Sequence, residues 1–311
     1  MTDIEPVVRI GSRPSAMAIA MSRQVIARLG EVAPLARFEH VLVSTTGDEW
    51  KGPLHEIGGK GSFVTELDQA QLAGRFDIGV HSSKDRDGLP DGLELVFLAR
   101  EDARDVLISR TGAGLDGLPG DATVGTSSPR RAAQLRRGWP HLQVAAARGN
   151  ADTRLAHLDS GRYDAVVLAL SGMRRLGLEH RVTAILEPDV LLPAAGAGIV
   201  ALSVRVGDHP AASLAAWLAD TDATACVTAE RAVLAGLGGS CLSAIAAHAT
   251  PAPGQRLRLR AAVYAPDGSH AVDVTETGAA THPEDLGLEV AGLLREKGAA
   301  ELLGPHGGHC G

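Results

Sequence analysis

Cationic side chains occur repeatedly in this sequence where a predicted strand ends or a predicted helix begins. A single acid, Asp85, stands among them, and a cysteine, Cys241, lies in a glycine-containing loop far downstream. Arginine binds a carboxylate through two parallel hydrogen bonds, a geometry that lysine cannot reproduce. The combination predicts a cleft for a ligand with several carboxylates, with one protein carboxylate and one thiol within reach. The cations are Arg13, Lys84, Arg130, Arg131, Arg148, Arg154 and Arg175.

Four segments combine a predicted strand end with small polar residues and arginine. In one of them, Ser128 is a favourable N-cap and Pro129 suits the first helical position. A helix start offers free N–H groups and the positive end of the helix dipole to an anion. One such segment is explained equally well by a plain helix cap with solvated arginines, but four in one cleft predict anion binding. The candidate binding residues are Arg13, Ser15, Thr126, Ser127, Ser128, Arg130, Arg131, Arg148, Gly149, Asn150, Arg154 and Arg175.

One carboxylate, Asp85, follows the predicted strand Asp77–His81. Neighbouring positive charge favours the ionised carboxylate, which then faces a cationic or N–H part of the ligand. The alternative is a surface Asp–Lys pair that closes a turn. Ser82 and Lys84 are further binding candidates, and so is Lys60 in a glycine-rich loop, which is either a lid or simply flexible.

The thiol of Cys241 follows Gly238, Gly239 and Ser240, so few side chains cover it. A cysteine close to cations can act as a nucleophile, whereas a buried free cysteine is usually inert. The chain has three cysteines at wide spacings and no C-x-x-C pair, which argues against a disulfide scaffold. We expect no metal site, including in the Gly/His-rich tail 304–311.

The composition indicates a globular protein of two or three domains, because 311 residues exceed one comfortable core. The net charge is −7 and aromatic residues make up 3%, which argues against binding nucleic acid. Between Gly125 and Leu155, six arginines face one acid, a local excess that suits a small anionic ligand. Neither a signal peptide nor an apolar run of the ~18 residues of a membrane helix is evident. We expect a cytoplasmic monomer without membrane or nucleic-acid partners.

Short apolar runs alternate with helical patterns over the first two thirds of the chain, which predicts α/β layers with largely parallel strand pairing. Two such lobes with a cleft between them place ligands beyond the carboxyl ends of the strands. The predicted strands are Val7–Ile10, His40–Ser44, Asp77–His81, Leu93–Leu98, Val106–Ser109, Thr123–Val124, Val144–Ala146 and Ala165–Leu170, and the predicted helices are Ser15–Leu29, Phe63–Gly74, Pro129–Arg137 and Ala151–Ser160.

The last third changes character to an α+β pattern. It predicts a helix over Ala223–Leu237, a hairpin that joins Leu257–Tyr264 to His270–Thr277 through an Asp-Gly turn, and a helix Pro283–Leu303 capped by Thr281. We therefore expect a first lobe from residues 1–99 with 194–215, a second lobe from 100–193, and a C-terminal domain from 216–311 that carries Cys241.

Ordered motifs over nearly the whole chain resemble the porphobilinogen deaminase (hydroxymethylbilane synthase) family. They are GGKG at 58–61, HSSKD at 81–85, RED at 100–102 with RD at 104–105, GTSSPRR at 125–131, RGN at 148–150 with TRL at 153–155, RLGL at 175–178, VTAER at 227–231, and Cys241.

The resemblance implies two α/β lobes like those of periplasmic binding proteins and a small C-terminal domain. It implies a transferase that joins four porphobilinogen units into a linear tetrapyrrole and releases ammonia at each step. It also implies a dipyrromethane cofactor attached through a thioether to Cys241, with Asp85 as the catalytic acid. By the same match, the carboxylates of the ligand are held by Arg13, Ser82, Lys84, Ser128, Arg130, Arg131, Arg148 and Arg154.

Several positions depart from the family pattern. A glutamate near an anionic chain is repulsive, and an alanine in place of glutamine cannot form hydrogen bonds. These changes leave two alternatives open beside the full deaminase: a divergent paralogue that makes a shorter or modified oligopyrrole, and a non-catalytic anion-binding protein. The departures are Met21 for Gln, Glu56 for a positive or amide side chain, Arg86 and Asp87 in place of the Pro usual soon after the lysine–aspartate pair, Ala197 for Gln, and Leu242–Ala244 without the usual Pro.

Overall fold

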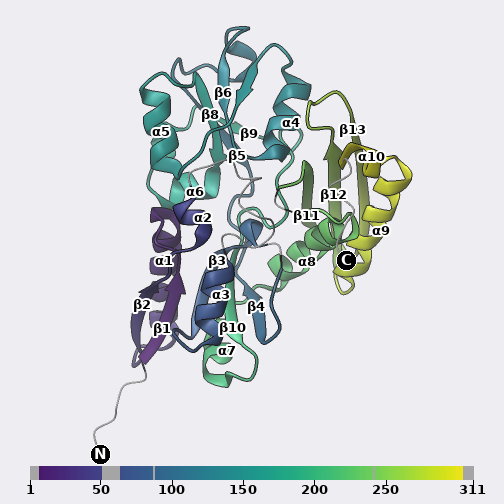
Figure 1. Ribbon diagram of the computed structural model, residues 1–311. Helices are drawn as coiled ribbons and strands as arrows, with labels where there is room; N and C mark the ends of the chain where they lie inside the picture. The colour runs from purple at the N-terminus through teal and green to yellow at the C-terminus, as the bar shows by residue number, and fades with distance from the viewer. Residues whose placement is uncertain (1–6, 51–63, 87, 241, 304–311) are drawn as a thin grey trace, which may run out of the picture. The chain divides into compact units, whose positions relative to one another are not determined.

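The computed structural model describes residues 7–50, 64–86, 88–240 and 242–303 (Figure 1). The chain divides into two compact units. The first comprises Met1–Arg100 and Ile199–Thr224, and the second comprises Glu101–Gly198 and Ala225–Gly311. The chain thus leaves the first unit after Arg100, returns at Ile199 to complete it, and leaves it again after Thr224.

The first unit is built on a five-stranded sheet with the order β2-β1-β3-β10-β4. β1 pairs in parallel with β2 and β3, whereas β10 is antiparallel to β3 and β4. Buried side chains of α1 and α7 share one core with this sheet, and α3 contributes to a second core around Phe76. The elements are β1 (Val7–Ser12), α1 (Ala16–Val32), β2 (Arg37–Leu42), α2 (Thr46–Glu49), α3 (Thr65–Leu72), β3 (Ile78–Ser82), β4 (Leu93–Phe97), β10 (Val200–Arg205) and α7 (His209–Ala216).

The second unit begins with another five-stranded sheet, in the order β7-β6-β8-β5-β9. β6 pairs in parallel with β7 and β8, whereas β5 is antiparallel to β8 and β9. Apolar residues on the two faces of this sheet form two separate clusters, as expected for strands covered on both sides. The elements are β5 (Asp105–Ser109), β6 (Thr123–Gly125), α4 (Pro129–Gly138), β7 (Gln143–Ala145), α5 (Ala151–Asp159), β8 (Ala165–Ala169), α6 (Leu170–Arg175) and β9 (Ala184–Leu186).

The C-terminal part of the second unit is an α+β domain. Its antiparallel sheet β11-β12-β13 packs against helices α8 and α9, and Figure 1 shows α9 and α10 along this sheet. None of the helices in the described residues has the length and apolar character needed to span a lipid bilayer. The elements are α8 (Thr221–Gly236), β11 (Ile245–Ala252), β12 (Arg256–Tyr264), β13 (Ala271–Ala279), α9 (Pro283–Glu296) and α10 (Ala299–Leu303).

A buried carboxylate in α8 connects two separate backbone segments of this unit. Glu230 is 0% exposed; its Oε2 accepts the N–H of Gly196 at 2.7 Å, and its Oε1 accepts that of Ala249 in β11 at 2.7 Å. A charge in the interior is costly unless it is hydrogen bonded, and here both oxygens are used. Glu230 therefore fastens residues 194–198, which lead on to β10, to the C-terminal sheet.

The structure confirms the expected fold class and corrects several details. Only half of the pairings in each five-stranded sheet are parallel, because β10 and β5 enter antiparallel. Strands β9, β10 and β11 were not predicted. Thr281 does not cap the closing helix, since His282 occupies that position without a side-chain cap. The predicted single helix is divided at Gly298, whose φ of 92° lies in the region that favours glycine.

Candidate active site

In the first unit, Asp85 lies in a short turn at the end of β3. The turn is the 3₁₀ helix η2 (Ser83–Asp85), and the Ser83 N–H donates to the Ile199 carbonyl at 2.9 Å. Ser82, Lys84 and Asp85 are half-buried. The Asp85 carboxylate has no hydrogen-bond or ion-pair partner among the residues that the structure describes, so it is available to a ligand.

Arg13, which follows β1, forms an ion pair that the sequence did not predict. Its Nε lies 3.1 Å from each carboxylate oxygen of Asp48. Burial raises the pKa of Asp48, but hydrogen bonds from Arg13 and Thr45 outweigh it, so the pKa is below its ordinary value. Ser15 caps α1 by accepting the Ala18 N–H at 3.3 Å. Arg13, which was predicted to bind the ligand, is therefore already paired with Asp48.

In the second unit, the end of β6 and the start of α4 form the arginine-rich corner that the sequence predicts. Ser128 caps α4 by accepting the Arg131 N–H at 3.4 Å. Ser127 donates its hydroxyl to the Ala147 carbonyl at 2.6 Å, and Thr126 Oγ1 accepts the Ser128 N–H at 3.2 Å. These bonds fix the backbone from which the two arginines extend.

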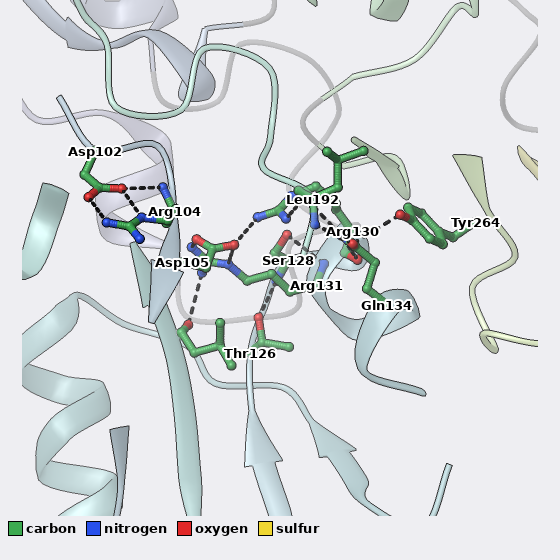
Figure 2. Close-up of polar contacts among 11 residues, drawn as sticks. Asp102, Arg104, Asp105, Thr126, Ser128, Arg130, Arg131, Gln134, Leu192 and Tyr264 are labelled. Carbon is green, nitrogen blue, oxygen red and sulfur yellow. Dashed lines mark hydrogen bonds and ion pairs between the residues drawn. The ribbon is translucent and has the colours of Figure 1, made fainter. Parts of the chain in front are cut away.

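Both arginines of this corner pair with one buried acid, Asp105, at the start of β5 (Figure 2). Arg130 Nη2 lies 2.6 Å from Oδ2, and Arg131 donates through Nε at 3.0 Å and Nη2 at 2.5 Å. Arg131 also donates to the Val167 carbonyl at 3.1 Å, and Arg130 donates to the Leu192 carbonyl. The guanidinium groups are thus held in defined positions.

Charge in this corner does not balance, because two cations share one anion. Burial raises the pKa of Asp105, but the charges of Arg131 and Arg130 outweigh it and hold that pKa far below its usual range. Burial lowers the pKa of Arg130, although Asp105 opposes that effect. Arg130 Nε is buried and has no acceptor among the described residues. One positive charge and one N–H group therefore remain in excess.

Gln134, one turn further along α4, joins this corner to the C-terminal domain. Its Nε2 donates to the Leu192 carbonyl at 3.1 Å, and its Oε1 accepts the Leu192 N–H at 2.7 Å and the Tyr264 hydroxyl at 3.1 Å (Figure 2). Burial raises the pKa of Tyr264, so its hydroxyl remains a donor. The hydrogen bond between Gln134 and Tyr264 therefore connects α4 to β12 of the C-terminal domain within the second unit.

Replacing Asp105 with asparagine is expected to destabilise the protein by about 3–5 kcal/mol, because it leaves two buried arginines without an anion. The folded-state pKa of Asp105 is depressed, so its stabilising contribution is complete above the ordinary aspartate pKa of about 3.9. It decreases only as pH falls below that value towards the depressed one. Urea unfolding at several pH values measures this difference.

The matched control is Asp159→Asn, since Asp159 pairs with Arg181 at an exposed position. Exposed pairs contribute little, so this variant should lose less than about 1 kcal/mol. Equal unfolding free energies for the Asp105 and Asp159 variants would contradict the structural role of the buried pair.

The second predicted corner lies between β7 and α5. Arg148 is half-buried and has no hydrogen-bond or ion-pair partner in the described part of the chain. Gly149 has a φ of 97°, and an added Cβ would lie 2.7 Å from Thr153. Asn150 caps α5 by accepting the Thr153 N–H at 2.9 Å, and Arg154 Nε donates to the Gly149 carbonyl at 2.9 Å. Arg148 is thus available to a ligand, whereas Arg154 uses its Nε to hold the backbone of this corner.

The acidic residues of the segment 100–105 pair with arginines of the same lobe. Glu101 lies 2.6 Å from Arg175 Nη2. Asp102 accepts hydrogen bonds from Arg104, which lower the pKa of Asp102 to about 2 despite its partial burial. Acids of this segment therefore hold Arg175, through Glu101, and Arg130 and Arg131, through Asp105.

The predicted nucleophile Cys241 lies outside the described residues, as do Lys60, Glu56 and the tail. On either side of it, the Ser240 N–H donates to Ser243 Oγ at 3.1 Å, and the Leu242 N–H donates to Ser240 Oγ at 3.2 Å. Cys226 is 2% exposed and belongs to the C-terminal core. Among the described residues, no group of three or more His, Cys, Asp or Glu is placed to hold a metal ion.

Comparison with known proteins gives two family models that together span most of the chain. The model described as "Porphobilinogen deaminase, dipyromethane cofactor binding domain" matches residues 8–213, and that described as "Porphobilinogen deaminase, C-terminal domain" matches residues 224–296. The chain belongs to the porphobilinogen deaminase family. It is a transferase of that family, as the sequence predicts.

Individual relatives agree with this assignment. A porphobilinogen deaminase of Acidithiobacillus ferrooxidans is 44% identical over 299 residues, which cover 95% of this chain and 97% of the relative. Porphobilinogen deaminase 2 of Streptomyces coelicolor is 42% identical and covers 95% and 96%. Among solved structures, the OxyR2 regulatory domain of Vibrio vulnificus matches with a TM-score of 0.43 and 15% identity, covering 69% of this chain and 95% of that one.

The residues of the second unit fit the dipyrromethane cofactor of porphobilinogen deaminases. This group carries several carboxylates, and the α4 corner offers an excess positive charge, an unused buried N–H and a helix N-terminus. The available Arg148 adds a second cation. The same unit contains the loop in which Cys241 occurs.

Several departures from the porphobilinogen deaminase pattern occupy structural positions. Met21 is 4% exposed in the core under α1, and Ala197 is buried beside the Glu230 contact. Arg86 is buried in an ion pair with Asp68. Sequence reasoning did not identify Asp105, Asp48, Gln134 or Asp68 as site-supporting residues. The sequence pattern that could have identified Asp105 is an acid at the first position of an apolar strand, directly before Val106.

Proposed function

We propose that this protein condenses porphobilinogen units head to tail, with release of ammonia at each step, to give the linear tetrapyrrole hydroxymethylbilane. The observation that carries this proposal is the half-buried Asp85 carboxylate, which has no partner among the described residues, in a chain of the porphobilinogen deaminase family. Asp85 is then the catalytic residue.

The chemistry requires one carboxylate in contact with the reacting pyrrole. Loss of ammonia from the aminomethyl group leaves a cationic methylene-pyrrolenine. Asp85 stabilises that cation through its negative charge and by accepting a hydrogen bond from the pyrrole N–H. It also gives a proton to the leaving amine and later takes one from the coupled ring carbon. Asp85 thus regains from the ring carbon the proton that it gave to the amine, and it is unchanged after each cycle.

The arginines bind the acetate and propionate groups of the pyrroles. Arg148 and Arg154 bind them from the α5 corner, and Arg130 and Arg131 supply positive charge and N–H groups from the α4 corner. Each charge-assisted contact contributes roughly 1.5–3 kcal/mol. The remaining proposed contacts come from Arg13, Ser15, Lys60, Ser82, Lys84, Thr126, Ser127, Ser128, Gly149, Asn150 and Arg175.

The proposed attachment point for the cofactor is Cys241. When bound, the dipyrromethane supplies the first nucleophilic pyrrole carbon. Cys226 is unsuited to this role, because its side chain is packed in the core of the C-terminal domain. The thiol of Cys241 holds the growing chain to the protein until release.

We further propose that the protein acts as a cytoplasmic monomer, without nucleic acid or membrane partners. Its net charge of −7 disfavours a nucleic-acid partner. The proposed domains are residues 1–99 with 194–215, residues 100–193, and residues 216–311. Size-exclusion chromatography with light scattering tests the monomer directly.

Product analysis with porphobilinogen tests the proposed reaction. The purified protein should release a linear tetrapyrrole and one ammonia for each porphobilinogen consumed. Accumulation of a dipyrrole or tripyrrole would favour a divergent paralogue instead. Binding of porphobilinogen without release of ammonia would favour an anion-binding protein and would contradict the proposal.

A further inference from the structure

The residue after Asp85 returns the chain to the interior of the first unit. The Arg86 side chain is 0% exposed and forms a two-bond ion pair with Asp68 of α3, itself 8% exposed. Arg86 Nη1 lies 2.8 Å from Asp68 Oδ1, and Nη2 lies 3.0 Å from Oδ2. This parallel geometry is the strong form of an arginine–carboxylate contact.

The pair belongs to a buried polar network that joins three elements. Arg86 Nη1 lies 3.4 Å from Nε2 and 3.5 Å from Nδ1 of His81 in β3, so the guanidinium lies against the imidazole. His81 Nε2 lies 2.9 Å from Ser203 Oγ in β10. The Gln71 side chain of α3 donates to the Ser203 carbonyl at 2.7 Å. The Arg86 side chain is therefore held by α3 and β3 directly, and His81 links it to β10.

A buried ion pair is weak evidence for stability, because removing two charges from water costs as much as their attraction returns. Burial raises the pKa of Asp68, and Arg86 only partly opposes that effect. An apolar pair of similar volume could fill this position. We therefore ask how the ion pair affects the position of the backbone next to Arg86.

The turn η2, which carries Asp85, is held at both of its ends. At the start of η2, the Ser83 N–H is held by the Ile199 carbonyl at 2.9 Å. At its end, the Arg86 N–H reaches the Ser83 carbonyl at 3.3 Å, a long hydrogen bond. The side chain of Arg86 adds the forked contact to Asp68 at this weaker end. Asp85 therefore lies between two fixed points, one at Ile199 directly before β10 and one on α3.

We propose that Arg86 and Asp68 form a positioning pair that sets the place of the Asp85 carboxylate against the reacting pyrrole. The inference rests on the proposed catalytic role of Asp85. Neither Arg86 nor Asp68 contacts substrate; they act through the backbone of η2. Because a misplacement of about 1 Å can cost about 100-fold in rate, the loss of this anchor affects the chemical step first.

The test replaces the ion pair with an apolar pair, Asp68→Leu with Arg86→Met, which avoids leaving one charge unpaired in the core. We expect a folded protein that retains its covalent cofactor mass. We also expect kcat to fall at least about tenfold, while KM changes less than about threefold. Wild-type kcat in the folded variant would overturn the proposal whatever its melting temperature, since a purely structural pair affects stability and leaves the chemical step unchanged.

A second variant keeps the proposal testable if the apolar pair does not fold. Arg86→Lys retains the positive charge but loses the fork. Its kcat should also fall while the cofactor mass remains, and unchanged kcat would overturn the proposal. The matched control is Arg37→Met with Glu39→Gln, which removes an exposed pair on β2 and should leave kcat unchanged.

Asp85→Asn in both backgrounds separates the positioning role from the catalytic role. If the pair positions Asp85, Asp85→Asn lowers kcat by a smaller factor in the apolar-pair variant than in the wild type. A decrease in kcat by the same factor in both backgrounds would overturn the positioning role and leave the catalytic role of Asp85 intact. Unchanged turnover of Asp85→Asn in the wild-type background would overturn both.

Discussion

Replacing Asp85 with asparagine is expected to lower kcat by about 10³-fold while leaving the protein folded. The amide keeps the size of the side chain but carries no negative charge for the substrate cation and cannot exchange a proton with the leaving amine. Since Asp85 has no partner among the described residues, its replacement breaks no ion pair within that part of the chain. The measurement is single-turnover formation of pyrrole product, together with the melting temperature.

Two controls make this result specific. Asp91→Asn changes an exposed acid of the same unit and should retain turnover and melting temperature. Intact mass of the Asp85 variant shows whether it carries its cofactor, because loading uses the same electrophile. Full turnover of Asp85→Asn would require another acid and would remove the basis of the proposed mechanism.

The Cys241→Ser variant is expected to show its bare sequence mass and no tetrapyrrole synthesis. The wild-type protein should exceed its sequence mass by one covalent dipyrromethane. A serine hydroxyl is far less nucleophilic than a thiolate, so it does not form the corresponding link. Mass spectrometry of the intact purified proteins measures the increment, and the product assay measures the lost activity.

The other cysteines supply matched controls for this experiment. Cys226→Ser should retain the increment, because that side chain is packed in the C-terminal core. Cys310→Ser should retain it as well. An increment that persists in Cys241→Ser but disappears in either control would assign the attachment to a different residue.

Local signals in the sequence were sufficient for the parts of the site that depend on neighbouring residues. Ser128 caps α4 as predicted, and Ser15 and Asn150, which lie at or directly before the start of predicted helices, cap α1 and α5. The Asp-Gly turn between β12 and β13 was also predicted correctly. In these cases the side chain acts on backbone groups within about three residues, so spacing alone carries the information.

Contacts between distant segments could not be predicted in the same way. Asp105 is 25 residues from Arg130, and Arg86 is 18 residues from Asp68. Strand β10 joins β3 from more than a hundred residues away, and its antiparallel direction depends on the chain returning from the second unit. Such pairings depend on tertiary packing, and a single sequence contains no local pattern for them.

The Glu230 contact has a consequence for how the product grows. Its carboxylate holds the chain segment after Leu192 to β11, while Gln134 holds Leu192 itself to Tyr264. The loop that contains the proposed attachment residue Cys241 and the arginines proposed to bind the first rings thus belong to the same compact unit. We therefore expect the first rings of the oligomer to stay bound to this unit while further rings are added.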